Sequence, residues 1–324
     1  MDADSAWHQI EQVLSGTRHD QKNDILYRLH QWLESSDEEQ PLSETPFDEA
    51  SSQLDDIAAF IRNKLPFEAQ LPSEKIVTPT SGDNADCNPE TTIHIDAFLY
   101  PDAEVDKLCD NGILSTYYCA DCGSRKTRPL TIISHSASKD RTQFIYQKLL
   151  PPDLLNGATV VDVGSRLGVL CYGAYLMSTA ERIVGVELNA DLCALQESVV
   201  QEFAMTDRIQ IVNADILNLP EVLAEAKAVI INNSFEFFSD NVKQREIWAF
   251  IARNCKPGCA LVTVPSLEEA FASLEVPTSL IDVARWVRKI PVNHDLSNPD
   301  IYGGEDSFAE AKGVHLYEVV HPMV

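Results

Sequence analysis

Thr159-Val-Val-Asp-Val-Gly-Ser-Arg-Leu-Gly168 is the stretch that decides the fold of this chain. Its first half is an apolar run, and its second half is a turn that holds Gly164 and Gly168 before an apolar helical stretch. Glycine allows a backbone to turn tightly and to approach a ligand closely. The helix that follows has free N–H groups at its start. In open α/β sheets, ligands bind at this place, beyond the carboxyl end of the first strand.

Short β-branched runs alternate with helical stretches from Thr159 onward. Such alternation is typical of a parallel sheet that helices cover on both faces. Two weaker runs, Trp286–Val292 and Val314–Val320, are expected to form an antiparallel end of the sheet. The sequence therefore predicts an α/β fold with a seven-stranded, mostly parallel, doubly wound sheet. The other predicted strands are RIVGVEL (182–188), RIQIVNADI (208–216), AVIINNSF (228–235) and CALVTVP (259–265).

Two acids stand at the ends of the second and third predicted strands. Glu187 follows the glycine turn by about 20 residues, the spacing at which a carboxylate accepts both hydroxyls of a ribose. Asp215 closes the next strand, where it is expected to bind an adenine amino group while Ile216 packs near the ring. These positions predict a nucleoside pocket. An NAD site is less favoured, because no G-x-G-x-x-G follows any strand.

The runs DVGSRLG, GVEL and NADI, in this order, resemble the motifs of class I S-adenosylmethionine (SAM)-dependent methyltransferases over about residues 140–324. The resemblance implies SAM as cofactor and methyl transfer as the activity. It also implies that Asp162, Gly164 and Gly168 line the methionine part of SAM, that Glu187 holds the ribose, and that Asp215 and Ile216 hold the adenine. Ser165 and Arg166, in the same turn, complete the predicted cofactor-binding residues.

Arg166 departs from the pattern of that family, whose turn usually reads D-x-G-x-G-x-G. The arginine replaces the middle glycine. Its side chain either crowds the ligand or pairs with the carboxylate of SAM, since a guanidinium suits a carboxylate. The first alternative leaves open a catalytically inactive scaffold or regulatory subunit with the same fold.

The fourth predicted strand ends in Asn232-Asn233-Ser-Phe235-Glu236. Side-chain carbonyls accept N–H bonds, and an aromatic wall stabilises a developing cation. The Asn-Asn-x-Phe order resembles the acceptor loop of non-SET histone lysine methyltransferases. We therefore expect a nitrogen acceptor in a protein or small molecule, with these four residues as catalytic candidates and Glu236 as the nearest base. The alternative is that the aromatic residues fill a core edge and the asparagines cap the next helix.

Cys119 and Cys122 form a C-x-x-C pair followed by glycine. Cys109 precedes this pair and His135 follows it, so these four residues are the right set for a tetrahedral structural zinc site. The alternative is an unliganded turn.

Four segments follow from these patterns: an acidic helical module (1–66), a linker rich in turn residues (67–90), the candidate zinc-knuckle segment (91–140) and the SAM-binding domain (141–324). Within the first, Leu54, Ile57 and Ile61 share one face of a helix predicted near Glu49–Leu65. Residues 1–65 are the candidate surface for a protein partner.

The net charge of −25 disfavours binding to nucleic acid or an anionic membrane, because like charges repel. It favours a basic protein as methyl acceptor. There is no apolar stretch long enough for a membrane span and no apolar secretory segment near the start. We therefore expect a cytoplasmic or nuclear protein.

Overall fold

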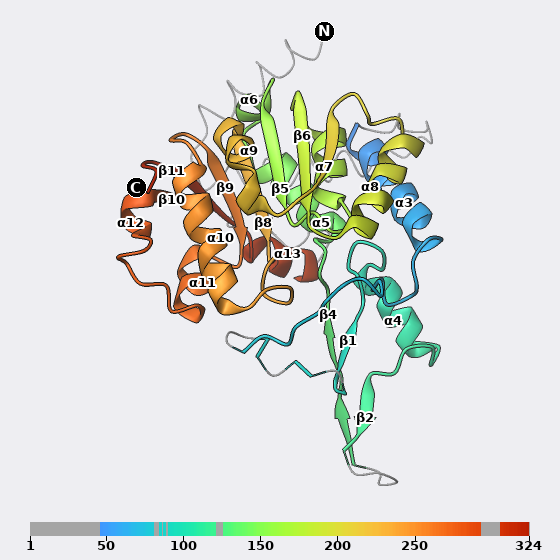
Figure 1. Ribbon diagram of the computed structural model, residues 1–324. Coiled ribbons are helices and arrows are strands. Elements are labelled where there is room, and N and C mark those ends of the chain that lie inside the picture. Colours follow the sequence, from blue (N-terminus) through green and yellow to red (C-terminus); the bar gives the residue numbers. More distant parts are fainter. Residues whose placement is uncertain are drawn as a thin grey trace, which may run out of the picture. The chain divides into compact units, whose positions relative to one another are not determined.

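A seven-stranded sheet in the order β10-β11-β9-β8-β5-β6-β7 organises the compact unit that begins at Pro46 (Figure 1). The computed structural model describes residues 46–324 apart from 81–83, 86, 89, 121–125, 293–304 and 324. Strands β5 to β9 are parallel, and β11 runs antiparallel to β9 and β10. The predicted doubly wound α/β fold is confirmed. The strands are β5 (Thr159–Val163), β6 (Arg182–Glu187), β7 (Ile209–Asn213), β8 (Ala228–Asn232), β9 (Ala260–Val264), β10 (Val287–Ile290) and β11 (His315–Val319).

Strand residues alternate between two apolar cores, one on each face of the sheet. Val160 and Ile230 belong to one core, whereas Val161 and Val229 belong to the other. No helix within the described ranges is long and apolar enough to span a bilayer. The first core also takes residues from α3 (Pro46–Arg62), α5 (Lys139–Phe144), the π-helical turn η1 (Ile145–Leu149), α6 (Pro152–Leu155), α7 (Val169–Met177), α8 (Ala190–Glu202) and α13 (Glu305–Lys312). The second takes them from α9 (Pro220–Glu225), α10 (Asn241–Asn254), α11 (Leu267–Ser273) and α12 (Val283–Trp286).

The strand order reverses between β5 and β8. From β5 the chain continues to β6 and β7 on one side, and then crosses back to place β8 and β9 on the other. At such a switch point the connecting loops separate and leave a crevice beyond the carboxyl ends of the strands.

Helix α3 belongs to the same compact unit as the sheet, and this unit begins at Pro46. Leu54, Ile57 and Ile61 are fully buried, and the helix packs against α7 and α8. The helix predicted near Glu49–Leu65 is confirmed. The sequence analysis placed it in a separate module, whereas the structure packs it on the helices of the sheet. Residues 1–45 lie outside the described part of the chain.

Residues between α3 and the sheet form two small sheets and contribute to the main core. β1 (Thr92–His94) pairs with β4 (Thr131–Ile133) in parallel, and β2 (Tyr117–Cys119) pairs with β3 (Thr127–Pro129) antiparallel. The helix α4 (Asp102–Asp110) lies between β1 and β2 in the sequence. Ala69 is fully buried in the first core. The small sheets and α4 fall within the predicted segment 91–140, and the buried Ala69 places the beginning of the predicted linker (67–90) against the core of the sheet unit.

Truncating Ile57 tests whether α3 is an integral part of the sheet unit. Ile57→Ala leaves a cavity in the first core, so the free energy of unfolding should fall by about 2–5 kcal/mol. Urea unfolding followed by circular dichroism measures the change. Asp56→Ala, at an exposed position of the same helix, should change it by less than about 0.5 kcal/mol. Equal stability of the two variants would mean that α3 is a detachable element.

Candidate functional site

The glycine turn after β5 has an unusual backbone conformation. Gly164, Arg166 and Gly168 have positive φ values of 76°, 44° and 83°. The N–H of Gly164 donates to the carbonyl of Val186 at 2.8 Å, which fastens the turn to β6. A Cβ atom at Gly164 would lie 2.6 Å from the Cβ of Ser234, in the loop after β8. Glycine is therefore required where the turn meets that loop.

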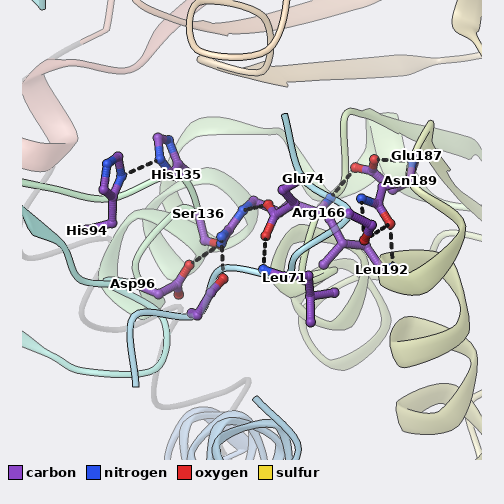
Figure 2. A network of polar contacts seen from close by, with 12 residues as sticks. Leu71, Glu74, His94, Asp96, His135, Ser136, Arg166, Glu187, Asn189 and Leu192 are labelled. Carbon is purple, nitrogen blue, oxygen red and sulfur yellow. Dashed lines mark hydrogen bonds and ion pairs between the residues drawn. The ribbon is translucent and has the colours of Figure 1, made fainter. Parts of the chain in front are cut away.

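The Glu187 carboxylate is held at the end of β6 by backbone donors. It accepts the N–H of Arg166 at 3.0 Å and that of Asn189 at 2.8 Å (Figure 2). Burial raises the pKa of Glu187, and these N–H groups oppose the shift because they stabilise the charged form. The carboxylate is thus oriented by both the glycine turn and the start of α8.

A cavity of about 350 Å³, called the first cavity here, lies at the carboxyl ends of β5, β6 and β7. Gly164, Arg166, Glu187, Asp215 and Ile216 line it, so the three strand ends identified in the sequence converge on one space. Its apolar wall consists of Val163, Val186, Leu188, Leu192, Ile216, Phe235, Phe238 and Ile247.

Asp215 has two partners at the far end of the first cavity. Its carboxylate accepts the N–H of Leu217 at 3.0 Å, which caps the 3₁₀ turn η2 (Ile216–Asn218). It also forms an ion pair with the ammonium of Lys243 in α10 at 3.0 Å. The acid and the lysine together form a polar edge beside the buried Ile216.

The guanidinium of Arg166 is occupied by groups from the N-terminal part of the unit (Figure 2). Its Nε donates to Glu74 at 3.1 Å, and Nη1 donates to Asp96 at 2.6 Å. Nη2 donates to the carbonyl of Ala69 at 2.6 Å, and Nη1 also lies 3.3 Å from the Ser136 hydroxyl. The charge of the guanidinium is therefore already neutralised by protein groups, although Arg166 also lines the first cavity.

Asp162, Ser165 and Gly168 do not line the first cavity. Asp162 is buried beneath the turn, where the Cys171 thiol donates to it at 3.8 Å. Burial raises the pKa of Asp162 to about 7, and the charge of Glu187 adds to the shift. The Ser165 hydroxyl donates to Gln196 at 2.9 Å. In this structure these residues support the turn, and their predicted contact with the cofactor stays a prediction.

His135 lies in the first cavity instead of in a zinc site. Its Nε2 is 2.7 Å from Nδ1 of His94, and its ring packs against Phe237 and Phe238. Burial lowers the pKa of His135 to about 3, and the charges of Arg166 and His94 contribute, so the ring is neutral near neutral pH.

No group of three His, Cys, Asp or Glu side chains suited to a metal ion occurs in the described residues. Cys109 lies in α4 and Cys119 in β2, whereas Cys122 falls outside the described part of the chain. The predicted Cys₃His zinc site is therefore not supported, because its histidine is engaged elsewhere.

A second cavity of about 500 Å³ adjoins the first at the loop after β8. Ser234 and Phe235 line both cavities. Asn233, which has a φ of 48°, and Glu236 line the second. The Glu236 carboxylate accepts a hydrogen bond from the Asn84 carboxamide at 3.0 Å.

Asn232 is the exception among the four predicted catalytic residues. It is buried, it lines neither cavity, and its side-chain carbonyl accepts a hydrogen bond from Arg141 in α5 at 3.0 Å. The structure thus brings Asn233, Phe235 and Glu236 together and gives Asn232 a link to α5.

Ser73, Glu74 and Lys75 line the first cavity, and the sequence analysis did not identify them. They lie in the stretch predicted as a linker, between Pro72 and Pro79, where no hydrophobic period marks a helix or a strand. The only local signal for a role in a site was the pair of charged residues in Ser73-Glu74-Lys75, and such charges are usually solvated.

No family model matches the chain, and no curated protein matches it. Similar solved structures include an RNA methyltransferase from Salinibacter ruber in complex with S-adenosyl-L-homocysteine, at 15% identity and a TM-score of 0.35, covering 57% of this chain and 92% of that one. An O-methyltransferase from Bacillus cereus in complex with SAH has 13% identity and a TM-score of 0.38, covering 58% and 84%. A precorrin 8w decarboxylase from Methanobacterium thermoautotrophicum has 14% identity and a TM-score of 0.38, covering 58% and 94%. Similarity at this level does not assign a function, which has to come from the site.

The pKa of Asp162 predicts a pH-dependent stability. Because the folded-state pKa of about 7 exceeds the usual 3.8, the folded chain holds this proton more tightly than the unfolded chain. The contribution of this proton to the free energy of unfolding is complete below the unfolded-state pKa of 3.8, and it is lost as the pH rises through the folded-state pKa of about 7. Asp162→Asn stays neutral throughout. From pH 5 to pH 8, the wild type should therefore lose about 2–3 kcal/mol relative to this variant in urea unfolding. If the free energies of unfolding of the wild type and the variant differed by the same amount at both pH values, the shifted pKa would be contradicted.

Proposed function

We propose that this chain is a SAM-dependent methyltransferase that binds SAM in the first cavity. The observation that carries the proposal is the convergence of Gly164, Glu187 and Asp215, from three strand ends, on one space at the switch point of the sheet. Dinucleotide and nucleoside cofactors bind at this place in open α/β folds.

The residues of the first cavity fit such a cofactor. A volume of about 350 Å³ lies in the range of about 300–1,000 Å³ that is usual for cofactor sites. Two backbone N–H groups, those of Arg166 and Asn189, each bond a different oxygen of Glu187, and a carboxylate has about four lone-pair sites, so it can still accept ribose hydroxyls. We assign the adenine to the wall formed by Ile216 and Leu192, beside Asp215, and the methionine part to the side of Gly164.

A degenerate, non-binding domain is less well supported by this geometry. The reason for that alternative was that the Arg166 side chain could crowd the ligand. Its guanidinium is instead bound by Glu74, Asp96 and the Ala69 carbonyl. With this pairing, the arginine is compatible with a cofactor against the glycine turn.

The second cavity is the proposed site of the methyl acceptor, because it adjoins the first through Ser234 and Phe235. When bound, SAM supplies a methyl group on a sulfonium centre. The residues of the chain have to orient the acceptor and take its proton. Glu236 is the candidate base, and the Asn84 carboxamide orients its carboxylate.

The second cavity favours a nitrogen acceptor. No lysine, arginine or histidine is among the described residues that line it. Hydrogen-bond donors and cations suit a surface of carboxylates, amide groups and aromatic rings. A lysine-type amine of a basic protein, or a small amine, fits this chemistry and the net charge of −25. The polar and aromatic side chains lining it are Asn84, Asn233, Phe235, Glu236, Asn241, Gln244, Trp248 and Glu269.

Calorimetric titration of the full chain with S-adenosylhomocysteine (SAH) tests the cofactor. The wild type should bind, and Glu187→Gln should weaken binding about 10–100-fold, because hydrogen bonds to a charged acceptor contribute about 1.5–3 kcal/mol. Glu181→Gln, an exposed position just before β6, is the matched control and should bind like the wild type.

A folded wild-type chain that does not bind SAH would overturn the proposal. Equal affinities of Glu187→Gln and the wild type would instead reject the assignment of the ribose to Glu187. Thermal melts of each variant establish that it is folded.

A further inference from the structure

A covering segment, residues 69–79, crosses the first cavity. The Asn189 carboxamide donates to the Ser73 hydroxyl at 3.1 Å, and Glu74 pairs with Arg166 (Figure 2). Further along, the N–H of Val77 donates to the carbonyl of Phe237 at 2.7 Å. In chain order, the segment therefore runs from the end of β6, past the glycine turn, to the loop after β8.

Buried charges hold the covering segment in place. The side chains of Arg166, Glu74 and Asp96 are exposed by only 6%, 3% and 1%. The second carboxylate oxygen of Glu74 also accepts the N–H of Leu71 at 2.7 Å, which shapes the segment from within. Buried ions must stay paired, so the position of the covering segment is coupled to the position of the glycine turn.

The cations of the first cavity differ in what neutralises them. Arg166 is paired with Glu74 and Asp96. Lys243 is paired with Asp215 at 3.0 Å and lies 3.6 Å from Glu246. Lys75 also lines the cavity, and none of the ion pairs among the described residues involves it. Lys75 is therefore the lining cation that is available to an anionic group of a ligand.

We infer that Lys75 of the covering segment binds the carboxylate in the methionine part of SAM, a role that rests on the proposed function. Lys75 lies between the contact of Glu74 with the glycine turn and the contact of Val77 with Phe237. The loop after β8 also meets the glycine turn, because a Cβ atom at Gly164 would lie 2.6 Å from the Cβ of Ser234. Lys75 therefore lies in the stretch of chain between two attachments to the surroundings of Gly164, where the methionine part is proposed to bind. An ammonium is a suitable partner for a carboxylate, and Lys75 is exposed, so its side chain is free to reach a ligand in the cavity that it lines.

Two related ligands separate this role from general support of the cavity. SAH carries the amino-acid carboxylate, whereas 5′-methylthioadenosine has the same nucleoside without it. In titrations of the full chain, Lys75→Met should weaken SAH binding about tenfold, because losing one charge-assisted hydrogen bond lowers an affinity by about this factor. Its affinity for 5′-methylthioadenosine should stay within about twofold of wild type. Lys75→Arg should restore most of the SAH affinity.

Lys256→Met is the matched control, because it removes the same charge at an exposed position before β9. It should leave both affinities unchanged. Added NaCl should weaken SAH binding to the wild type more than to Lys75→Met, since salt screens the charge pair.

The outcomes separate the two proposals. A wild type that binds neither ligand overturns the proposed function, and the Lys75 role with it. A wild type that binds both ligands, with Lys75→Met unchanged for SAH, overturns only the Lys75 role. Equal weakening of both ligands by Lys75→Met also overturns it, because the lysine then acts on the cavity as a whole.

Discussion

The buried pairing of Arg166 with Glu74 and Asp96 is the interaction on which the site depends. It joins the turn after β5 to two segments that lie about 70 to 90 residues earlier in the chain. Removing one partner of a buried ion pair typically costs about 3–5 kcal/mol, because the other charge is left uncompensated. The turn and the covering segment are therefore expected to form or to be lost together.

This pairing also explains how a large residue is accommodated in the tight turn after β5. Arg166 adopts a φ of 44°, a conformation that L-residues rarely take and that costs about 1–3 kcal/mol. Its backbone N–H remains directed at Glu187, whereas its guanidinium is bound by the N-terminal segments. The backbone thus keeps the role expected of the turn, and the side chain adds an attachment for the covering segment.

The sheet could be predicted from the sequence because its signals are local. Runs such as Thr159–Val163 and Ala228–Asn232 are β-branched, and the positions of Glu187 and Asp215 follow from where their strands end. The convergence of these acids on one cavity then follows from the parallel arrangement alone.

The remaining features depend on contacts between distant residues. Nothing local indicates that Arg141 bonds Asn232, or that His135 lies against His94. The stretch around Glu74 has no periodicity, and its structure comes from contacts with distant residues, among them the buried ion pair with Arg166 and the hydrogen bond from Val77 to Phe237. Spacing rules describe elements, whereas these side chains are placed by tertiary packing.

Hydrogen–deuterium exchange of the full chain, with and without SAH, tests the central claim most directly. The account predicts slower exchange on binding in the glycine turn, at Glu187–Asn189 and in residues 214–217, because the nucleoside would cover all three strand ends. Unchanged exchange in these regions at saturating SAH, or protection confined to the second cavity, would contradict it.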